Sequence, residues 1–194
     1  VEYLQSVGIM HEDIKADNII VNESYGLRLI DFGLAQRTDQ GEIAPGETPI
    51  GAQTQWSPEK ATCNGYDHRS DMWAAVCTFV HSVAGCPPWV RRFEGIKALM
   101  YIIGTKSPPL EDIPDGLPSE VVDLITQAWR VEVKDRPHPR EVMQHKAFNL
   151  LRERHITDPI FTAHFTETPE SIFSSEISGE ISTEISTEIS REIS

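Results

Sequence analysis

Residues 11–33 contain a polar loop, two short β-rich runs and an Asp-Phe-Gly triplet, in that order, and this stretch restricts the fold more than any other. The β-rich runs cover 19–21 and 27–30, and the residues between them are typical of a turn, so the sequence predicts a β-hairpin. Because the two outer ends of a hairpin lie side by side, Asn18 and Asp31 are expected to be neighbours in space. The fold must therefore bring the polar loop and the triplet to the same end of the hairpin.

The polar residues of this stretch have the chemistry of metal-assisted phosphoryl transfer. Such a transfer needs a group that orients the nucleophile and cations that neutralise charge, and little covalent chemistry from the protein. Asp13 is the candidate catalytic residue that accepts or orients the proton of an acceptor hydroxyl. Asn18 and Asp31 offer the oxygen ligands that Mg²⁺ prefers, so they are the candidate metal ligands beside ATP. Lys15, a second catalytic candidate, is expected to reach the transferring phosphate of bound ATP.

The pattern His-x-Asp-x-Lys-x-x-Asn at 11–18, followed by Asp-Phe-Gly at 31–33, resembles the catalytic loop and metal-binding motif of the eukaryotic protein kinases. The resemblance implies a protein kinase that uses ATP and Mg²⁺. In this family, a lysine at the position of Lys15 accompanies serine/threonine specificity. The resemblance also implies that His11 and Phe32 pack against each other and do not catalyse.

Three later motifs resemble further kinase elements in the expected order. They are Trp56-Ser57-Pro58-Glu59 at the end of an activation segment, Ser70-Asp71-Met72-Trp73 at the start of the central helix, and Asp135-Arg136-Pro137. The resemblance implies a buried ion pair between Glu59 and Arg136. It also implies that Asp71 accepts hydrogen bonds from the backbone of the catalytic loop.

Segments at 87–92, 101–103, 107–113 and 136–149 resemble a narrower group, the MAP kinase kinase kinases of inflammatory signalling typified by the Cot (tumour progression locus) and NF-kappa-B-inducing kinases. The resemblance covers residues 1 to about 150. It implies a place in a MAP kinase or NF-kappa-B cascade, and a MAP kinase kinase or an inhibitor-of-kappa-B kinase as the protein substrate.

Two positions depart from the usual kinase pattern. Glu12 stands where most kinases have the arginine that pairs with a phosphorylated activation-segment residue, so we expect no such phosphate latch. Ala52 stands where a threonine hydroxyl ordinarily bridges the base aspartate and the catalytic lysine. This second departure leaves a non-catalytic alternative open, a pseudokinase or scaffold module that binds signalling partners.

The sequence as a whole predicts a mainly α-helical fold, a protein-kinase-like C-terminal lobe with a short β-hairpin at the catalytic cleft and a disordered tail. Helices are expected at 1–7, with Gly8 as the cap, and at about 69–84, 94–103, 119–130 and 139–146. The catalytic loop begins at residue 11 with no Gly-rich phosphate loop before it, so we expect the N-terminal lobe to be absent from 1–150 and the fragment alone to be inactive. A linker at 151–174 and a low-complexity tail of Glu-Ile-Ser repeats at 175–194 follow, and interaction through this tail is a further alternative function.

Charge and cysteine usage limit the partners and the compartment. The formal net charge of −13 argues against nucleic acid or an anionic membrane as the main partner. Cys63, Cys77 and Cys86 have neither the paired spacing of a zinc site nor an even count for disulfides, which favours a reducing, cytoplasmic location. The longest apolar run, 72–85, is shorter than the roughly 18 residues of a membrane span and predicts a buried helix. Nothing in the sequence indicates the oligomeric state.

Overall fold

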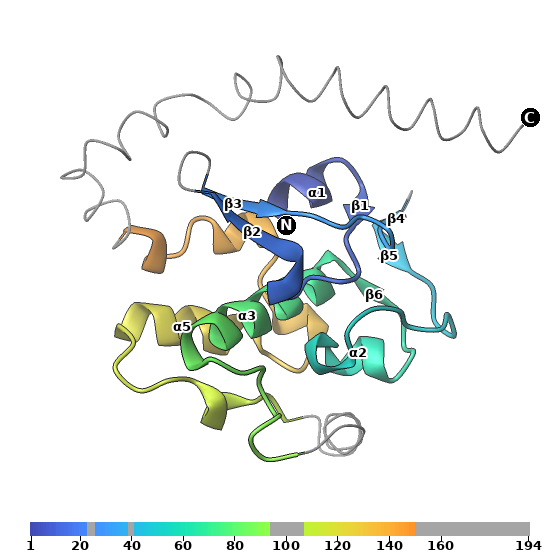
Figure 1. Ribbon diagram of the computed structural model, residues 1–194. Coiled ribbons are helices and arrows are strands. Elements are labelled where there is room, and N and C mark those ends of the chain that lie inside the picture. Colours follow the sequence, from blue (N-terminus) through green and yellow to red (C-terminus); the bar gives the residue numbers. More distant parts are fainter. Residues whose placement is uncertain (23–25, 39–40, 94–106, 150–194) are drawn as a thin grey trace, which may run out of the picture. The chain divides into compact units, whose positions relative to one another are not determined.

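The computed structural model of the chain describes residues 1–22, 26–38, 41–93 and 107–149 (Figure 1). The chain divides into two compact units, Val1–Ala147 and Phe148–Ser194. Only Phe148 and Asn149 of the second unit are described, so the fold below is that of the first unit. The predicted helix at 94–103, the linker and the repeat tail lie outside the described residues.

The described part of the first unit is partly helical. Its α-helices are α1 (Glu2–Ser6), α2 (Pro58–Ala61), α3 (His68–Ala84), α5 (Ser119–Ala128) and α6 (Pro139–Val142). Short 3₁₀ turns connect them: η1 (Ala16–Asn18), η2 (Gln53–Gln55), η3 (Leu110–Asp112) and η4 (Val133–Asp135). α3 and α5 confirm the helices predicted at 69–84 and 119–130. α6 is shorter than the predicted 139–146, because the amides of Gln144 and His145 bond to carbonyls three residues back and close tighter turns.

The first helix ends one residue earlier than the sequence predicts. Val7, and not Gly8, is its C-cap, and Gly8 follows with a left-handed φ of +70°. The Gly8 amide donates to the carbonyl of Gln5 at 3.1 Å, which satisfies one of the carbonyls left open at the end of the helix. The chain therefore turns directly from α1 into the strand that precedes the polar loop.

The strands among the described residues form three two-stranded antiparallel sheets (Figure 1). β1 (Ile9–Met10) pairs with β4 (Gln36–Arg37), β2 (Ile19–Asn22) with β3 (Gly26–Leu29), and β5 (Glu42–Ile43) with β6 (Tyr66–Asp67). The β2–β3 pair is the predicted hairpin, with Ile19 opposite Leu29. Beyond this pair, the Ile30 amide donates to the Asn18 carbonyl at 2.9 Å. The register thus brings the polar loop and the Asp-Phe-Gly triplet together, as predicted.

α3 is the centre of the core and the platform of the site. Its buried apolar side chains are Met72, Trp73, Ala74, Val76, Cys77 and Val80. Trp73 lies against Trp129, with ring centroids 6.2 Å apart. α3 also packs against α5, α6, β6 and the turns η1 and η2, which explains why the 72–85 run is apolar around much of the helix. Among the described residues, no helix has the length and apolar character that crossing a membrane requires.

Candidate active site

Asp71, in the first turn of α3, fixes the backbone of the polar loop. The His11 amide donates to Asp71 Oδ2 at 2.7 Å and the Glu12 amide donates to Oδ1 at 3.1 Å. All three residues are buried. The His11 ring also packs edge-on against Phe32, with centroids 4.8 Å apart. Both predictions for these contacts are confirmed, and the residues just before Asp13 are held by the core helix.

Asp13, Lys15 and Asn18 meet in this loop. Lys15 Nζ donates to Asp13 Oδ2 at 2.6 Å. Asn18 Nδ2 donates to the same oxygen at 3.1 Å and to the Asp13 carbonyl at 2.9 Å. The turn η1 makes this possible, because the Asn18 amide bonds back to the Lys15 carbonyl at 3.1 Å. The loop is therefore closed on Asp13 by its own polar residues.

The hydrogen bonds to Asp13 set both its charge and its free acceptor site. Burial opposes ionisation, but the hydrogen bonds from Lys15, the Ala52 amide and Asn18, with the charge of Lys15, hold the pKa of Asp13 below its ordinary value of 3.8. The bond to Asp13 in turn raises the pKa of Lys15. Asp13 Oδ2 accepts two described hydrogen bonds and Oδ1 accepts one. Since each carboxylate oxygen has two acceptor sites, Oδ1 keeps one for a hydroxyl proton.

Asp31 stands at the outer end of the hairpin, one residue beyond the bond between Ile30 and Asn18. Its backbone is left-handed, with a φ of +61°, and its Oδ1 accepts a hydrogen bond from the Gly33 amide at 3.2 Å. The side chain is exposed. Its charge, together with those of Asp13 and Asp17, contributes to the raised pKa of Lys15.

Asn18 and Asp31 fit a magnesium site that phosphate oxygens would complete. The Asn18 side-chain nitrogen is engaged with Asp13, which leaves the amide oxygen for a metal. Among the described residues, no group of three or more His, Cys, Asp or Glu side chains could hold a metal ion alone. Mg²⁺ is commonly bound by one or two carboxylates together with substrate phosphates and water. This donor set therefore suits a metal that arrives with a nucleotide.

Gly51 allows the segment before α2 to approach the loop closely. Its φ is +91°, and a Cβ at this position would lie 2.2 Å from the Glu12 carbonyl oxygen and 3.1 Å from Asp13 Oδ1. Only glycine fits this conformation and this space. The close approach lets the Ala52 amide donate to Asp13 Oδ1 at 2.8 Å. The methyl side chain of Ala52 cannot supply the hydroxyl hydrogen bond of the usual threonine, but its backbone amide contacts Asp13 instead.

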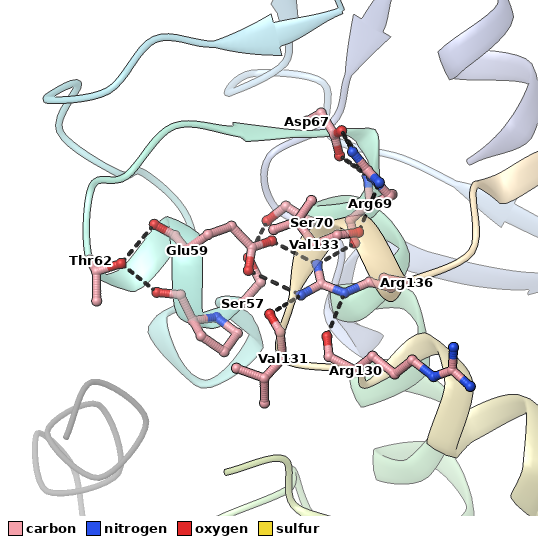
Figure 2. A network of polar contacts seen from close by, with 11 residues as sticks. Ser57, Glu59, Thr62, Asp67, Arg69, Ser70, Arg130, Val131, Val133 and Arg136 are labelled. Atoms are coloured by element: carbon pink, nitrogen blue, oxygen red, sulfur yellow. Dashed lines mark hydrogen bonds and ion pairs between the residues drawn. The ribbon is translucent and has the colours of Figure 1, made fainter. Parts of the chain in front are cut away.

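The predicted ion pair between Glu59 and Arg136 is present and buried. Figure 2 shows the Arg136 guanidinium facing the Glu59 carboxylate, with N–O distances of 2.7 and 3.0 Å. The same guanidinium donates to the carbonyls of Arg69 at 3.0 Å, Arg130 at 3.1 Å and Val131 at 3.4 Å. Arg136 is only 2% exposed. The pair therefore ties α2 to the turn before α6 with nearly all of its polar atoms satisfied.

A second buried charge pair connects α2 to the polar loop. Lys60 Nζ donates to Glu12 Oε2 at 2.6 Å and to the Glu12 carbonyl at 3.1 Å. The Tyr66 hydroxyl donates to the same Oε2 at 3.1 Å. Each of the three residues is 4% exposed. Sequence analysis did not identify Lys60 or Tyr66, although a lysine directly after Glu59, in a segment expected to be buried, is a signal that an acidic partner lies nearby.

The geometry defines a class of enzyme. A carboxylate held by a lysine and an amide, with an exposed second carboxylate two residues beyond a hairpin strand, suits phosphoryl transfer to a hydroxyl group. Residues 1–148 match the protein kinase domain family, and the chain belongs to this family.

Its relatives include MAP kinase kinase kinases. Mitogen-activated protein kinase kinase kinase 8 of Rattus norvegicus is 31% identical over 154 residues, which cover 78% of this chain and 32% of the relative. Mitogen-activated protein kinase kinase kinase 2 of Arabidopsis thaliana is 32% identical over 145 residues, 74% of this chain and 22% of the relative. Mitogen-activated protein kinase kinase kinase 17 of the same plant is 30% identical over 146 residues, 74% of this chain and 38% of the relative. The chain thus spans less than half of the length of each of these relatives.

Proposed function

We propose that this domain belongs to a serine/threonine protein kinase that acts as a MAP kinase kinase kinase and transfers the γ-phosphate of ATP to a protein hydroxyl. The observation that carries the proposal is the closed arrangement of Asp13, Lys15 and Asn18, with the Asp13 carboxylate ionised and one acceptor site free on Oδ1. The similarity to MAP kinase kinase kinases supports the place in a cascade.

The residues of the loop have distinct tasks in this reaction. The acceptor hydroxyl donates its hydrogen bond to Asp13 Oδ1, which aligns the oxygen lone pair with the γ-phosphorus. As the new O–P bond forms and the bond from phosphorus to the ADP oxygen breaks, the hydroxyl proton passes to this carboxylate. Lys15, which lies 2.6 Å from Asp13, stabilises the negative charge on the transferring phosphoryl group. A lowered pKa makes Asp13 a weak base, so alignment is its larger contribution.

Asn18 and Asp31 are the residues proposed to hold Mg²⁺. The ion supplies positive charge beside the phosphates when it is bound. The position of the Asn18 amide oxygen is fixed before the metal binds, because the side-chain nitrogen donates two hydrogen bonds to Asp13. Asp31 is less constrained, since its side chain is exposed and its one described hydrogen bond is to the Gly33 amide.

The proposal extends to partners and location. We propose a MAP kinase kinase or an inhibitor-of-kappa-B kinase as substrate, a cytoplasmic location, and a kinship with the Cot and NF-kappa-B-inducing kinases. We also propose that the chain represents the C-terminal lobe and needs a second lobe for full activity. The replacement of the usual threonine by Ala52 favours one alternative, a pseudokinase that binds partners without catalysis.

Phosphoryl transfer to a MAP kinase kinase, measured with the natural full-length protein and Mg-ATP, tests the proposal. Asp13→Asn is expected to lower kcat by about 10²–10⁴-fold, because the carboxylate that aligns the acceptor hydroxyl and receives its proton is lost. Asp31→Asn is expected to raise the Mg²⁺ concentration that gives half of the maximal rate, because a carboxylate ligand is lost. Asp17→Asn is the matched control, since Asp17 is exposed on the same loop, and it should retain activity. Equal rates for the native protein, Asp13→Asn and Asp31→Asn would favour the pseudokinase.

A further inference from the structure

The network of Glu12, Lys60 and Tyr66 joins three separate elements at the residue before the base aspartate. Glu12 belongs to the polar loop, Lys60 to α2 at the end of the activation segment, and Tyr66 to β6. The Lys60 ammonium contacts both the carboxylate and the carbonyl of Glu12, and it lies 5.2 Å from the centroid of the Tyr66 ring. Because Lys60 binds both the side chain and the main chain of Glu12, it fixes the position of this residue and the orientation of its carbonyl group.

The backbone of Glu12 needs such support. Its φ is +70°, a left-handed conformation that costs a non-glycine residue free energy. Its carbonyl oxygen lies between the Lys60 ammonium and Gly51, where a Cβ would be only 2.2 Å away. The next residue in the chain is Asp13, and the residue after Gly51 is Ala52, whose amide bonds to Asp13. The Glu12 carbonyl is therefore the point at which the activation segment and the base aspartate are set relative to each other.

The charges of the network depend on one another. Burial raises the pKa of Glu12, and the charge and hydrogen bond of Lys60 oppose this rise. Burial and the charge of Glu12 raise the pKa of Tyr66, which keeps its hydroxyl protonated as a donor. The second carboxylate oxygen, Glu12 Oε1, has no hydrogen-bond partner within the part of the chain that the structure describes. Without Lys60, the buried carboxylate would retain the Tyr66 hydroxyl as its one described side-chain donor, and a buried charge without its partner is strongly unfavourable.

We infer that Lys60 is a positioning residue, a built-in latch that fixes the activation segment to the catalytic loop through Glu12 and makes phosphorylation of the segment unnecessary for this purpose. The inference rests on the proposed kinase function. In a phosphate latch, the anion is on the segment and the cation on the loop. Here the polarity is reversed, because the cation Lys60 is on the segment side and the anion Glu12 is on the loop. A phosphate on the segment would be repelled by Glu12 and would compete for Lys60.

Kinetic constants of the full-length protein, after phosphatase treatment, test the latch. Lys60→Met is expected to lower kcat by about 10–100-fold, as a misplaced catalytic group does, with the KM for ATP changed much less. Lys60→Arg keeps a cation and should recover most of kcat. The double variant Glu12→Gln/Lys60→Met should be more active than Lys60→Met, because it has no unpaired buried carboxylate. Lys146→Met, which removes an exposed lysine, is the control.

Hydrogen exchange at the Ala52 amide separates the latch from the kinase function. Lys60→Met should raise the exchange rate of this amide, since the Ala52–Asp13 bond is then less well held, whereas Lys146→Met should not. Native kcat in Lys60→Met, a loss of native activity on phosphatase treatment, or unchanged Ala52 exchange in Lys60→Met would overturn the latch. A native protein that transfers no phosphate, with Ala52 exchange still raised in Lys60→Met, would refute the kinase function and leave the anchoring role standing.

Discussion

Replacement of Arg136 by methionine tests whether the buried ion pair with Glu59 holds the domain together. Methionine fills part of the volume of the arginine side chain but donates no hydrogen bond. The change leaves the Glu59 carboxylate buried without its cation, at 8% exposure. It also removes the donor from the carbonyls of Arg69 and Arg130, which accept at 3.0 and 3.1 Å.

The magnitude follows from these losses. Removing one partner of a buried, hydrogen-bonded ion pair costs about 3–5 kcal/mol, most of it the penalty of the charge left behind. For a domain of this size, each kcal/mol lowers Tm by about 2–4 °C, so Arg136→Met should lower Tm by roughly 6–20 °C. The Arg136 guanidinium also lies 5.0 Å from the centroid of the Trp73 ring, a contact that methionine replaces only in part. The double variant Glu59→Gln/Arg136→Met should be more stable than Arg136→Met alone.

Thermal unfolding of the natural full-length protein, followed by tryptophan fluorescence, measures this effect. Trp73 and Trp129 pack on each other in the core and report on its integrity. Lys146→Met is the matched control, because it removes a lysine from an exposed ion pair, and it should leave the unfolding curve unchanged. A decrease in Tm below about 2 °C for Arg136→Met, or a double variant that is the least stable of the set, would refute the reasoning.

Two further predictions concern backbone space and pH. Gly51→Ala should destabilise the domain by more than about 2 kcal/mol and reduce kcat, because its Cβ would meet the Glu12 carbonyl at 2.2 Å. Gly46→Ala is the control for the loss of a positive-φ glycine, because no described atom lies within 4 Å of the added Cβ. Equal effects of the two substitutions would contradict the clash. Burial raises the pKa of Asp67, but the hydrogen bonds and the charge of Arg69 outweigh burial and hold this pKa below 3.8. The ionised Asp67 therefore stabilises the fold fully above pH 3.8, and this stabilisation is lost as pH falls through the lower pKa of the folded state. The free energy of unfolding of native protein minus that of Asp67→Asn, from urea titrations, should therefore shrink as pH falls below about 4, and a constant difference would contradict the assignment.

Local patterns predicted the elements that position the site. The hairpin followed from two β-rich runs and a turn, and its register alone accounts for the bond between Ile30 and Asn18. α3 followed from a long apolar run. The roles of Asp71 and of the Glu59–Arg136 pair came from the kinase resemblance, and both contacts are present. Each of these features depends on a short stretch of sequence whose residue pattern determines the local structure or matches a known motif.

The parts that sequence analysis missed depend on contacts between distant residues. Lys60 and Glu12 are 48 positions apart, and neither residue type is typical of a buried site. Ala52 was considered only for the hydroxyl that it lacks, because a sequence shows side chains and not the direction of a backbone amide. The length of α6 was overestimated, since nothing in the residue types after Val142 distinguishes an α-helical turn from a 3₁₀ turn.

The two sides of the site differ in how firmly they are held. Asp13 and the residue before it are fixed from α2, α3 and the segment at Gly51, through contacts that are mostly buried. Asp31 is exposed, and its described contact is a single bond within its own triplet. A group that aligns a nucleophile must be in place before the reaction, whereas a metal ligand can complete its geometry when Mg-ATP supplies the other ligands. The asymmetry therefore matches the proposed roles, in which Asp13 aligns the hydroxyl and Asp31 binds the metal.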